Sequence, residues 1–506
     1  LTFRSDVRSA SLSPDGETVA FYTDGEIMVV PATGGEPRTI ARGIVRDLSA
    51  PQLSWRPDGR SLLVTTFDSR ATRRDLWSID LATGERRPLG AARAGEQHTL
   101  GDEVIAGHQI KRRLMIGPPG APSRIECDVE GGYAWLWRVA VLGTVVHVTM
   151  ETPTGERALL ATDAACKPPQ LVVPPIAAMD LIPRADGRVF AALRGEPPTA
   201  VEVDRRGQPR GVARPLPLGT SQVIGVRRDG GFVVLRNTAT WRLVERSASG
   251  SRELGRGVGD TVVELAPDRS HLAVIDRRPG EAPALYVTTL DAPEARTRRL
   301  VPWARQVAWS PDGALLAATV VDGQRVQLVV VDRESGELRE LAAEGISPDA
   351  DPAWLDDRRI AYNRSDHRAY RWIDRVDGTR GDLIDPAPGW PFELARSPAG
   401  DDFALYWNRE PEPGVWLFPA TGEPRLLHGA AGEQHPVHGW SPDGRTLWVS
   451  DGRTVERIDP TTGAPTRFAT LELDPTSRVE DIAALADDRV LLHVVTVTSD
   501  LVLAGP

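Results

Sequence analysis

Cysteine and lysine are scarce in this chain. Of its 506 residues only two are cysteines, Cys127 and Cys166, and only two are lysines, Lys111 and Lys167, so almost every basic residue is arginine. Two cysteines cannot supply a structural zinc site built on thiolate ligands. They fall at similar points of neighbouring repeats, on strands expected to lie well apart, so their pairing stays open. Two cysteines also do not identify the cellular compartment.

Long apolar runs are also missing. The longest candidate, residues 139–150, carries His147 and is far shorter than the ~18 residues that a spanning helix needs, so it predicts a buried strand. We therefore expect no direct membrane insertion. No signal peptide is recognisable, and because the repeat pattern begins at once, we expect the natural polypeptide to continue upstream. The net charge of −10 and the lack of a basic stripe argue against nucleic acid as a partner.

Catalytic signatures are a further absence. The chain has no Gly-x-Ser-x-Gly elbow and no glycine-rich phosphate loop, so we expect no catalytic residue and no cofactor. His435 and His438 stand three positions apart, and residues at that spacing on a strand point to opposite faces. A shared metal is therefore not expected there, and the sequence predicts no metal site.

What the chain does contain is an internal repeat. The motif Ser-Pro-Asp-Gly is intact at 13–16, 310–313 and 441–444, and altered copies follow at steps of 42 to 44 residues. Two steps, near Glu103 and Gly143, keep the spacing without the motif, which gives twelve units in all. The Asp-Gly pair predicts a tight turn, because glycine accepts a positive φ and aspartate bonds the local backbone.

Each unit has the pattern of four short strands. An apolar strand precedes the motif, two alternating strands follow it, and a short polar strand ends the unit after a turn such as residues 82–85. Tryptophan recurs on the first strand, and there we expect it in the core: Trp55, Trp309, Trp354 and Trp440. Four antiparallel strands in about 40 residues, repeated radially, are typical of propeller blades.

Twelve units divide most simply into six and six, because propellers usually hold about four to eight blades. The sequence thus predicts an all-β chain of two tandem six-bladed β-propellers, residues 1–249 and 250–506, with the boundary near Ser249. Each half begins with a fourth strand and ends with a third. We expect the N-terminal strand of each half to close its ring, which removes exposed edges. Seven plus five blades is the alternative.

These repeats resemble the TolB-like, WD-repeat-like β-propeller repeats, most clearly at 13–16, 310–313 and 441–444 and least between about 95 and 180. Such repeats occur in the TolB protein and in the C-terminal sensor region of bacterial serine/threonine kinases. The resemblance implies a propeller but no particular function. It also implies a periplasmic or other extracytoplasmic location, with the cytoplasm as the alternative. No kinase motif or TolB-type N-terminal domain is present in this chain.

Three functions are compatible with this scaffold. The first is a non-catalytic module that binds a protein or a small polar ligand at a channel mouth, as the sensor or docking part of a larger bacterial signalling or envelope protein. The second is a propeller-type lyase or hydrolase acting on sugar or peptide. The third is a spacer with featureless channel mouths.

The loops before the first strands carry the candidate binding residues. The pentapeptide Ala-Gly-Glu-Gln-His occurs at 94–98 and again at 431–435, and several acids precede other first strands. If these loops converge, they form a polar, mostly acidic rim that suits a cation, a polar ligand or a basic peptide segment. The residues of this rim are Asp47, Glu96, Gln97, His98, Asp260, Asp349, Asp351, Glu433, Gln434 and His435.

Overall fold

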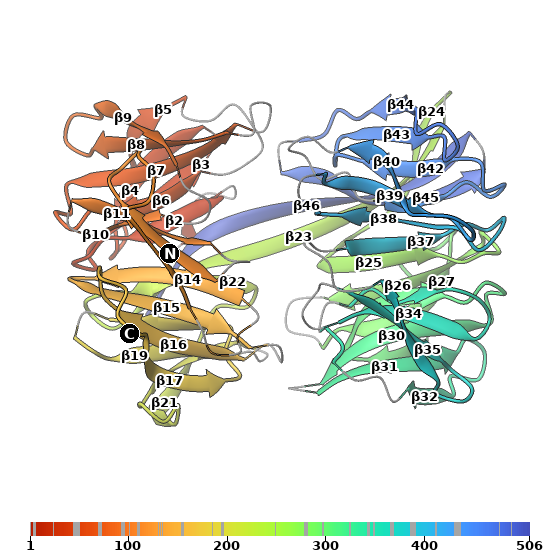
Figure 1. Cartoon of the computed structure of the whole chain (residues 1–506), viewed down its shortest axis with the longest axis horizontal. Helices are drawn as coiled ribbons and strands as arrows, with labels where there is room; N and C mark the ends of the chain where they lie inside the picture. Colours follow the sequence, from red (N-terminus) through yellow and green to blue (C-terminus); the bar gives the residue numbers. More distant parts are fainter. Residues whose placement is uncertain are drawn as a thin grey trace. The chain divides into compact units, whose positions relative to one another are not determined.

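The computed structural model of the chain describes most of its residues. They are 2–3, 7–23, 25–43, 51–68, 73–92, 97–100, 102–108, 112–129, 131, 133, 135–152, 156–184, 186–193, 197–247, 249–277, 282–295, 298–322, 325–341, 345–347, 350–364, 369–384, 391–409, 412–429, 437–474, 476–486 and 488–505. Every regular element among them is a β-strand (Figure 1). A search of these residues for a helix long and apolar enough to cross a membrane finds none.

The strands form eleven antiparallel sheets, ten of four strands and one of six, in two compact units. Within each four-stranded sheet the strands pair in chain order, as expected of propeller blades. Unit 1 comprises residues 1–238 and 498–506, and unit 2 comprises residues 239–497. This division differs from the expected division into two consecutive halves with a boundary near Ser249. Unit 2 is inserted into unit 1 instead of following it.

Five of the four-stranded sheets belong to unit 1. Their strands are β2 (Ser9–Leu12), β3 (Thr18–Thr23), β4 (Glu26–Pro31) and β5 (Arg38–Arg42); β6 (Gln52–Trp55), β7 (Ser61–Asp68), β8 (Arg73–Asp80) and β9 (Arg86–Ala91); β10 (Gln97–Leu100), β11 (Glu103–His108), β12 (Arg113–Gly117) and β13 (Ile125–Asp128); β14 (Trp135–Leu142), β15 (Val145–Glu151), β16 (Arg157–Thr162) and β17 (Gln170–Ile176); and β18 (Asp180–Pro183), β19 (Val189–Leu193), β20 (Thr199–Val203) and β21 (Pro209–Pro215).

The other five belong to unit 2. Their strands are β25 (Asp260–Leu265), β26 (His271–Arg277), β27 (Ala284–Thr289) and β28 (Arg299–Pro302); β29 (Ala304–Trp309), β30 (Leu315–Asp322), β31 (Arg325–Asp332) and β32 (Leu338–Leu341); β33 (Ala353–Trp354), β34 (Arg359–Asn363), β35 (Tyr370–Asp374) and β36 (Arg380–Ile384); β37 (Pro391–Arg396), β38 (Phe403–Trp407), β39 (Gly414–Phe418) and β40 (Arg425–Gly429); and β41 (Val437–Trp440), β42 (Leu447–Ser450), β43 (Thr454–Ile458) and β44 (Pro465–Thr470).

The six-stranded sheet contains the two strands that continue from one unit to the other. They are β23 (Phe232–Ser247) and β46 (Arg489–Ala504), each of 16 residues (Figure 1). In unit 1 they pair with β22 (Thr220–Val226) and β1 (Thr2–Phe3), and in unit 2 with β24 (Gly250–Val258) and β45 (Ser477–Ala486). The N-terminal strand β1 thus belongs to a sheet of unit 1 and pairs there with a strand from the end of the chain.

The turn motif has the structural role that its recurrence predicts. In the copy at 310–313, the Ser310 hydroxyl donates to Asp312 Oδ1 at 2.6 Å, and the same hydroxyl oxygen accepts the Leu315 N–H at 2.9 Å. The N–H of Ala314 donates to Asp312 Oδ1 at 3.0 Å. These hydrogen bonds, first among them that from Ser310, hold the pKa of Asp312 below its usual value. The aspartate therefore serves the turn, which every sheet needs.

The first-strand tryptophans join one sheet to the next. Each is buried, and its indole N–H donates to a carbonyl on the first strand of the preceding sheet. The four bonds run from Trp55 to Ser11 (2.9 Å), from Trp309 to Glu264 (3.2 Å), from Trp354 to Ala308 (3.2 Å) and from Trp440 to Ala395 (3.0 Å). The expectation that these residues are core is confirmed, and each large ring also satisfies its one polar atom.

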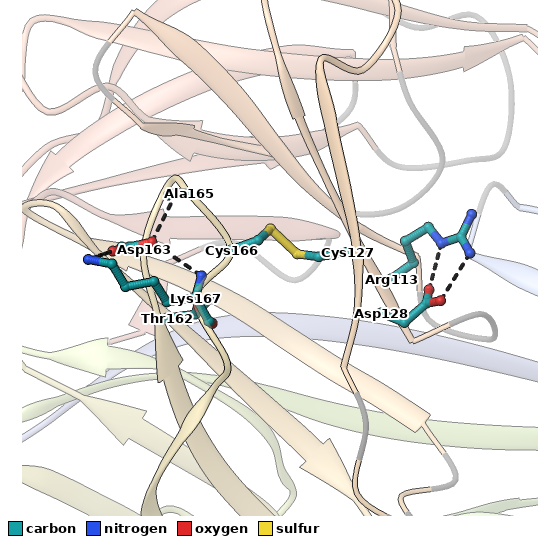
Figure 2. The surroundings of a disulfide bond; sticks show 8 residues. All are labelled: Arg113, Cys127, Asp128, Thr162, Asp163, Ala165, Cys166 and Lys167. Atoms are coloured by element: carbon teal, nitrogen blue, oxygen red, sulfur yellow. Dashed lines mark hydrogen bonds and ion pairs between the residues drawn. A yellow bond between two sulfur atoms is a disulfide. The ribbon is translucent and has the colours of Figure 1, made fainter.

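The two cysteines form a disulfide between neighbouring sheets of unit 1, with their Cα atoms 6.2 Å apart (Figure 2). Cys127 lies on β13, and Cys166 lies in the turn after β16, where Asp163 Oδ1 accepts the N–H of Ala165 at 2.9 Å. Both cysteines pack on one apolar cluster that contains Leu114 and Leu136. The expectation that they lie far apart is therefore wrong, because facing sheets bring their outer parts together around a shared core.

Removing this disulfide should destabilise the protein. The two cysteines are 39 positions apart. Closing a loop of that size by a disulfide stabilises the folded state by about 4 kcal/mol relative to the unfolded chain. We expect the double variant Cys127→Ser, Cys166→Ser to lose about that much free energy of unfolding in urea. A reducing agent should lower the melting temperature of the wild type but leave the double variant unchanged. Two free thiols in the native, unreduced protein, counted by alkylation and mass spectrometry, would contradict the assignment.

Candidate functional site

Four carboxyl groups from four different sheets gather in unit 2. We call Glu264, Asp351, Glu393 and Asp481 the carboxylate cluster. Glu264 lies on β25, Glu393 on β37 and Asp481 on β45, whereas Asp351 comes two residues before β33. Each therefore stands on or just before the first strand of its sheet. In a radial arrangement of sheets, first strands are the ones that meet at the centre.

Ionisation is disfavoured for three of the four carboxyl groups in the cluster. Burial raises the pKa of Glu264 well above its usual range, and the charges of Asp481 and Asp351 raise it further. Burial and then the charge of Asp481 raise the pKa of Asp351 to about 7. For these two carboxyls, no arginine or lysine among the described residues counteracts the shift. Buried charges are normally paired, so such a group is a functional-site candidate.

Glu393 and Tyr370 extend the same electrostatic network. Burial raises the pKa of Glu393 well above its usual range, followed by the charges of Asp351 and Asp481. The pKa of the Tyr370 hydroxyl is likewise raised, first by burial and then by Asp351 and Glu393. Glu393 has a left-handed backbone, with φ of 56°, where the register of β37 and β38 shifts. Such a conformation is uncommon for glutamate, and irregular strand positions are frequent beside functional sites.

His438 on β41 is the nitrogen-bearing member of this site. Its side chain is only 3% exposed, and its Nδ1 lies 3.1 Å from Asp481 Oδ1. That same oxygen accepts the N–H of Ile482 at 2.8 Å. His438 Nε2 and Glu393 Oε2 are both buried, and neither has a hydrogen-bond partner within the described part of the chain. Buried polar atoms are normally satisfied, so these two atoms point to a missing hydrogen-bond partner.

Unit 1 fills the corresponding positions differently. Arg138 on β14 forms an ion pair with Asp180, the first residue of β18, at 2.6 Å from Nη1 to Oδ2. Ser54 Oγ on β6 lies 3.1 Å from His98 Nδ1 on β10. In the first contact a carboxylate meets a guanidinium, and in the second an imidazole meets a hydroxyl. The described first strands of unit 1 therefore offer no counterpart of the carboxylate cluster.

The structure locates four of the ten residues proposed for the rim. Gln97 is buried on β10, His98 is the next residue, Asp260 begins β25, and Asp351 belongs to the carboxylate cluster. Nothing beyond its backbone position is described for Asp260. The remaining six lie outside the described residues: Asp47, Glu96, Asp349, Glu433, Gln434 and His435.

Sequence reasoning missed Glu264, Glu393 and Asp481 because it searched the loops before the first strands and not the strands themselves. His438 was considered, but only as one half of a metal-binding pair. Their position relative to the repeat motif was the signal that could have identified two of them. Glu264 stands two residues before the altered turn motif at 266–269, and Glu393 stands four residues before the altered motif at 397–400. Among the residues described, no set of three or more histidine, cysteine, aspartate or glutamate side chains is arranged to hold a metal ion.

Comparisons with known proteins add little to this picture. No family model matches the chain, and no curated protein matches it. Among solved structures, a TolB candidate from Agrobacterium tumefaciens is 15% identical, covering 51% of this chain and 98% of that one, with a TM-score of 0.39.

Two further structures match over more of the chain. The extracellular domain of a candidate one-component system, BT4673 from B. thetaiotaomicron, is 9% identical over 99% of this chain and 76% of that one, with a TM-score of 0.34. The tricorn protease is 10% identical over 93% and 62%, with a TM-score of 0.28. These scores are too low to carry an argument, so the description of the fold rests on strand pairing alone.

The raised pKa of Asp351 predicts an unusual pH dependence of stability. Its folded value of about 7 lies above the unfolded value of about 3.9, so as the pH rises the unfolded chain loses this proton first. The carboxyl therefore costs the native state stability progressively between about pH 4 and about pH 7, and the cost persists above that range.

We expect Asp351→Asn to be more stable than the wild type by about 2 kcal/mol at pH 8, which is half of the full linkage because the side chain is partly exposed, and to differ little at pH 4. Urea unfolding at the two pH values measures the difference. Asp382→Asn, at an exposed site on β36, is the control and should show no such gain. A loss of stability in Asp351→Asn at pH 8 would count against the raised pKa of Asp351.

Proposed function

We propose that this chain is a non-catalytic recognition module made of two six-bladed β-propellers. We propose further that unit 2 binds a positively charged group of a ligand or partner at the carboxylate cluster. The rigid strand scaffold would hold the recognition residues, as propellers do in general.

Contacts between neighbouring sheets support six blades in each unit. In unit 1 the first strands pack in the order β2, β6, β10 and β14, the fourth and fifth sheets meet through β16 and β18, and β18 packs on β22, which returns to β2. In unit 2 the order is β25, β29, β33, β37, β41 and β45, and β45 returns to β25. The sixth blade of each unit would be its share of the six-stranded sheet, with β23 and β46 as the two middle strands.

The observation that carries the binding proposal is the disfavoured ionisation of Glu264, Asp351 and Glu393, each of which feels the charge of Asp481. Ionising several crowded carboxyls without a positive partner costs free energy. A bound cation would supply that partner, so its binding would favour the ionised carboxylates. A structural spacer has no need of such a cluster.

The disulfide supports an oxidising location for this module. Disulfides persist in the periplasm and outside the cell and are rare in the cytosol. We therefore propose a periplasmic or other extracytoplasmic role within a larger bacterial signalling or envelope protein, as the sensor or docking part.

An enzyme is the second candidate, and one observation favours it. Asp351 has a pKa raised to about 7, first by burial and then by the charge of Asp481, and a carboxyl that keeps its proton near neutral pH has the properties of a general acid. A hydrolase or lyase acting on sugar or peptide would use such a pair.

The binding proposal is tested with two matched triple variants of the full chain. The site variant carries Glu264→Gln, Asp351→Asn and Glu393→Gln. The control variant carries Glu253→Gln, Glu340→Gln and Asp382→Asn, three acids in exposed ion pairs on outer strands of unit 2, and so replaces the same number of carboxyl groups by amides. Thermal shift is measured with lysine amide, arginine amide, Ca²⁺ and Mg²⁺, and with glutamate and glucose as anionic and neutral probes.

We expect at least one cationic probe to stabilise the wild type and the control variant but not the site variant, because only the site variant lacks the cluster. If no cationic probe separates the two variants, the proposal fails. Turnover of a panel of chromogenic glycosides and peptides that is lost in the site variant alone would favour the enzyme instead.

A further inference from the structure

We infer that the carboxylate cluster of unit 2 takes an organic cation with several N–H donors, a guanidinium group above all, and not a metal ion. This inference rests on the proposed function and names the chemical class of its ligand.

Unit 1 supplies an internal precedent for a guanidinium at such a place. Arg138 Nη1 donates to Asp180 Oδ2 at 2.6 Å and to the carbonyl of Val223 at 3.1 Å. These three residues come from β14, β18 and β22, which belong to three different sheets. The arginine and aspartate side chains are 17% and 7% exposed. The repeat therefore accommodates a guanidinium among its first strands, supplied in unit 1 by the chain itself.

Unit 2 has the same arrangement without the arginine. Asp180 and Asp481 each use Oδ1 to accept the N–H of the following residue, at 2.9 Å and 2.8 Å. The side-chain partner of each lies one repeat earlier, Arg138 at 42 positions and His438 at 43 positions. Histidine thus stands where unit 1 has arginine. Its ring is shorter and brings no fixed positive charge to the cluster.

Two polar atoms of the site lack a hydrogen-bond partner among the described residues. In the neutral imidazole whose Nδ1–H donates to Asp481 Oδ1, Nε2 is an acceptor. Nε2 is buried without a donor within the described residues, and Glu393 Oε2 is in the same state. A ligand that completes the site must therefore bring N–H or O–H donors as well as positive charge.

A metal ion fits these observations less well. It needs several ligand atoms within about 2.0–2.6 Å of one point. The described residues contain no group of three or more candidate ligands so arranged, although the carboxyls lie close enough to raise one another's pKa. A guanidinium spreads its charge over a plane and has five donors, so it can reach acceptors that are too far apart for one ion.

The guanidinium could belong to an arginine of a partner protein or to a small free molecule. Both sources have the same recognition chemistry, so the probes separate them. N-acetyl-L-arginine amide represents the small molecule, and a seven-residue peptide with one central arginine among glycines represents the protein segment.

Isothermal titration of the full chain compares four further probes with these two. They are the neutral isostere N-acetyl-L-citrulline amide, N-acetyl-L-lysine amide, CaCl₂ and MgCl₂. We expect the arginine derivative to bind at least ten-fold more tightly than the lysine derivative, and the citrulline derivative not to bind. Asp351→Asn should weaken the arginine derivative at least ten-fold, whereas the matched exposed variant Glu340→Gln should not change it.

The most specific variant is His438→Arg. It places in unit 2 the residue that unit 1 has, so the chain would fill its own site. We expect it to raise the melting temperature and to abolish binding of the arginine derivative. His438→Lys is the control for charge alone and should stabilise the fold less.

The outcomes separate this inference from the proposed function. Variant-sensitive binding of Ca²⁺ or Mg²⁺ without binding of the arginine derivative would overturn the inference and leave a cation-binding module. Equal binding of the arginine and citrulline derivatives would overturn it as well. If Asp351→Asn changes the affinity for none of the cationic probes, both proposals are wrong. Tighter binding of the peptide than of the amide would support a protein segment as the source, and equal binding a small molecule.

Discussion

The structure depends on how each sheet packs against the next. A four-stranded sheet has two faces to cover, and here the neighbouring repeat covers them with apolar clusters and with a recurring indole hydrogen bond. The tryptophan that ends one first strand donates to a carbonyl of the preceding first strand, as Trp309 does to Glu264. The same contact fixes the backbone that carries a member of the carboxylate cluster. Packing thus places the carboxyl groups, and the surrounding strands hold them close together although their ionisation is disfavoured.

The shared strands add a second constraint. Strands β23 and β46 each supply a middle strand to both units, and unit 1 is made of two separate pieces of sequence. A cut near Ser249 would separate β24 from the strand it pairs with, so a fragment ending there would lack part of its last sheet. The chain is therefore best studied whole. The two units also differ in chemistry, with Arg138 neutralising Asp180 in one and His438 meeting Asp481 in the other.

Much of the fold could be predicted from the sequence, because strand pairs and tight turns leave local signals. The Ser-Pro-Asp-Gly copies mark turns, and the tryptophans before them mark buried first strands. The continuation of β23 through residues 238–247 had no such signal, since a strand that changes partners midway keeps the same alternation. The disulfide could not be predicted from the sequence either, because Cys127 and Cys166 come together only when two neighbouring sheets pack against each other. Asp351 was proposed from its position before a first strand, and it stays a prediction. Glu264 and Glu393 were missed because a strand acid looks like any solvent-facing residue until the neighbouring sheets are in place.

The central claim is that unit 2 holds carboxyl groups whose charges are not compensated by the protein itself. The most direct measurement is a titration of the side-chain carboxyl carbons by NMR in protein labelled at aspartate and glutamate, assigned with Asp351→Asn and Glu393→Gln. The account predicts that Asp351 titrates near pH 7 and that Glu264 and Glu393 titrate well above the usual glutamate range. If all three titrated below about pH 5, in the range of ordinary exposed carboxyls, the cluster would be compensated and the account would be wrong.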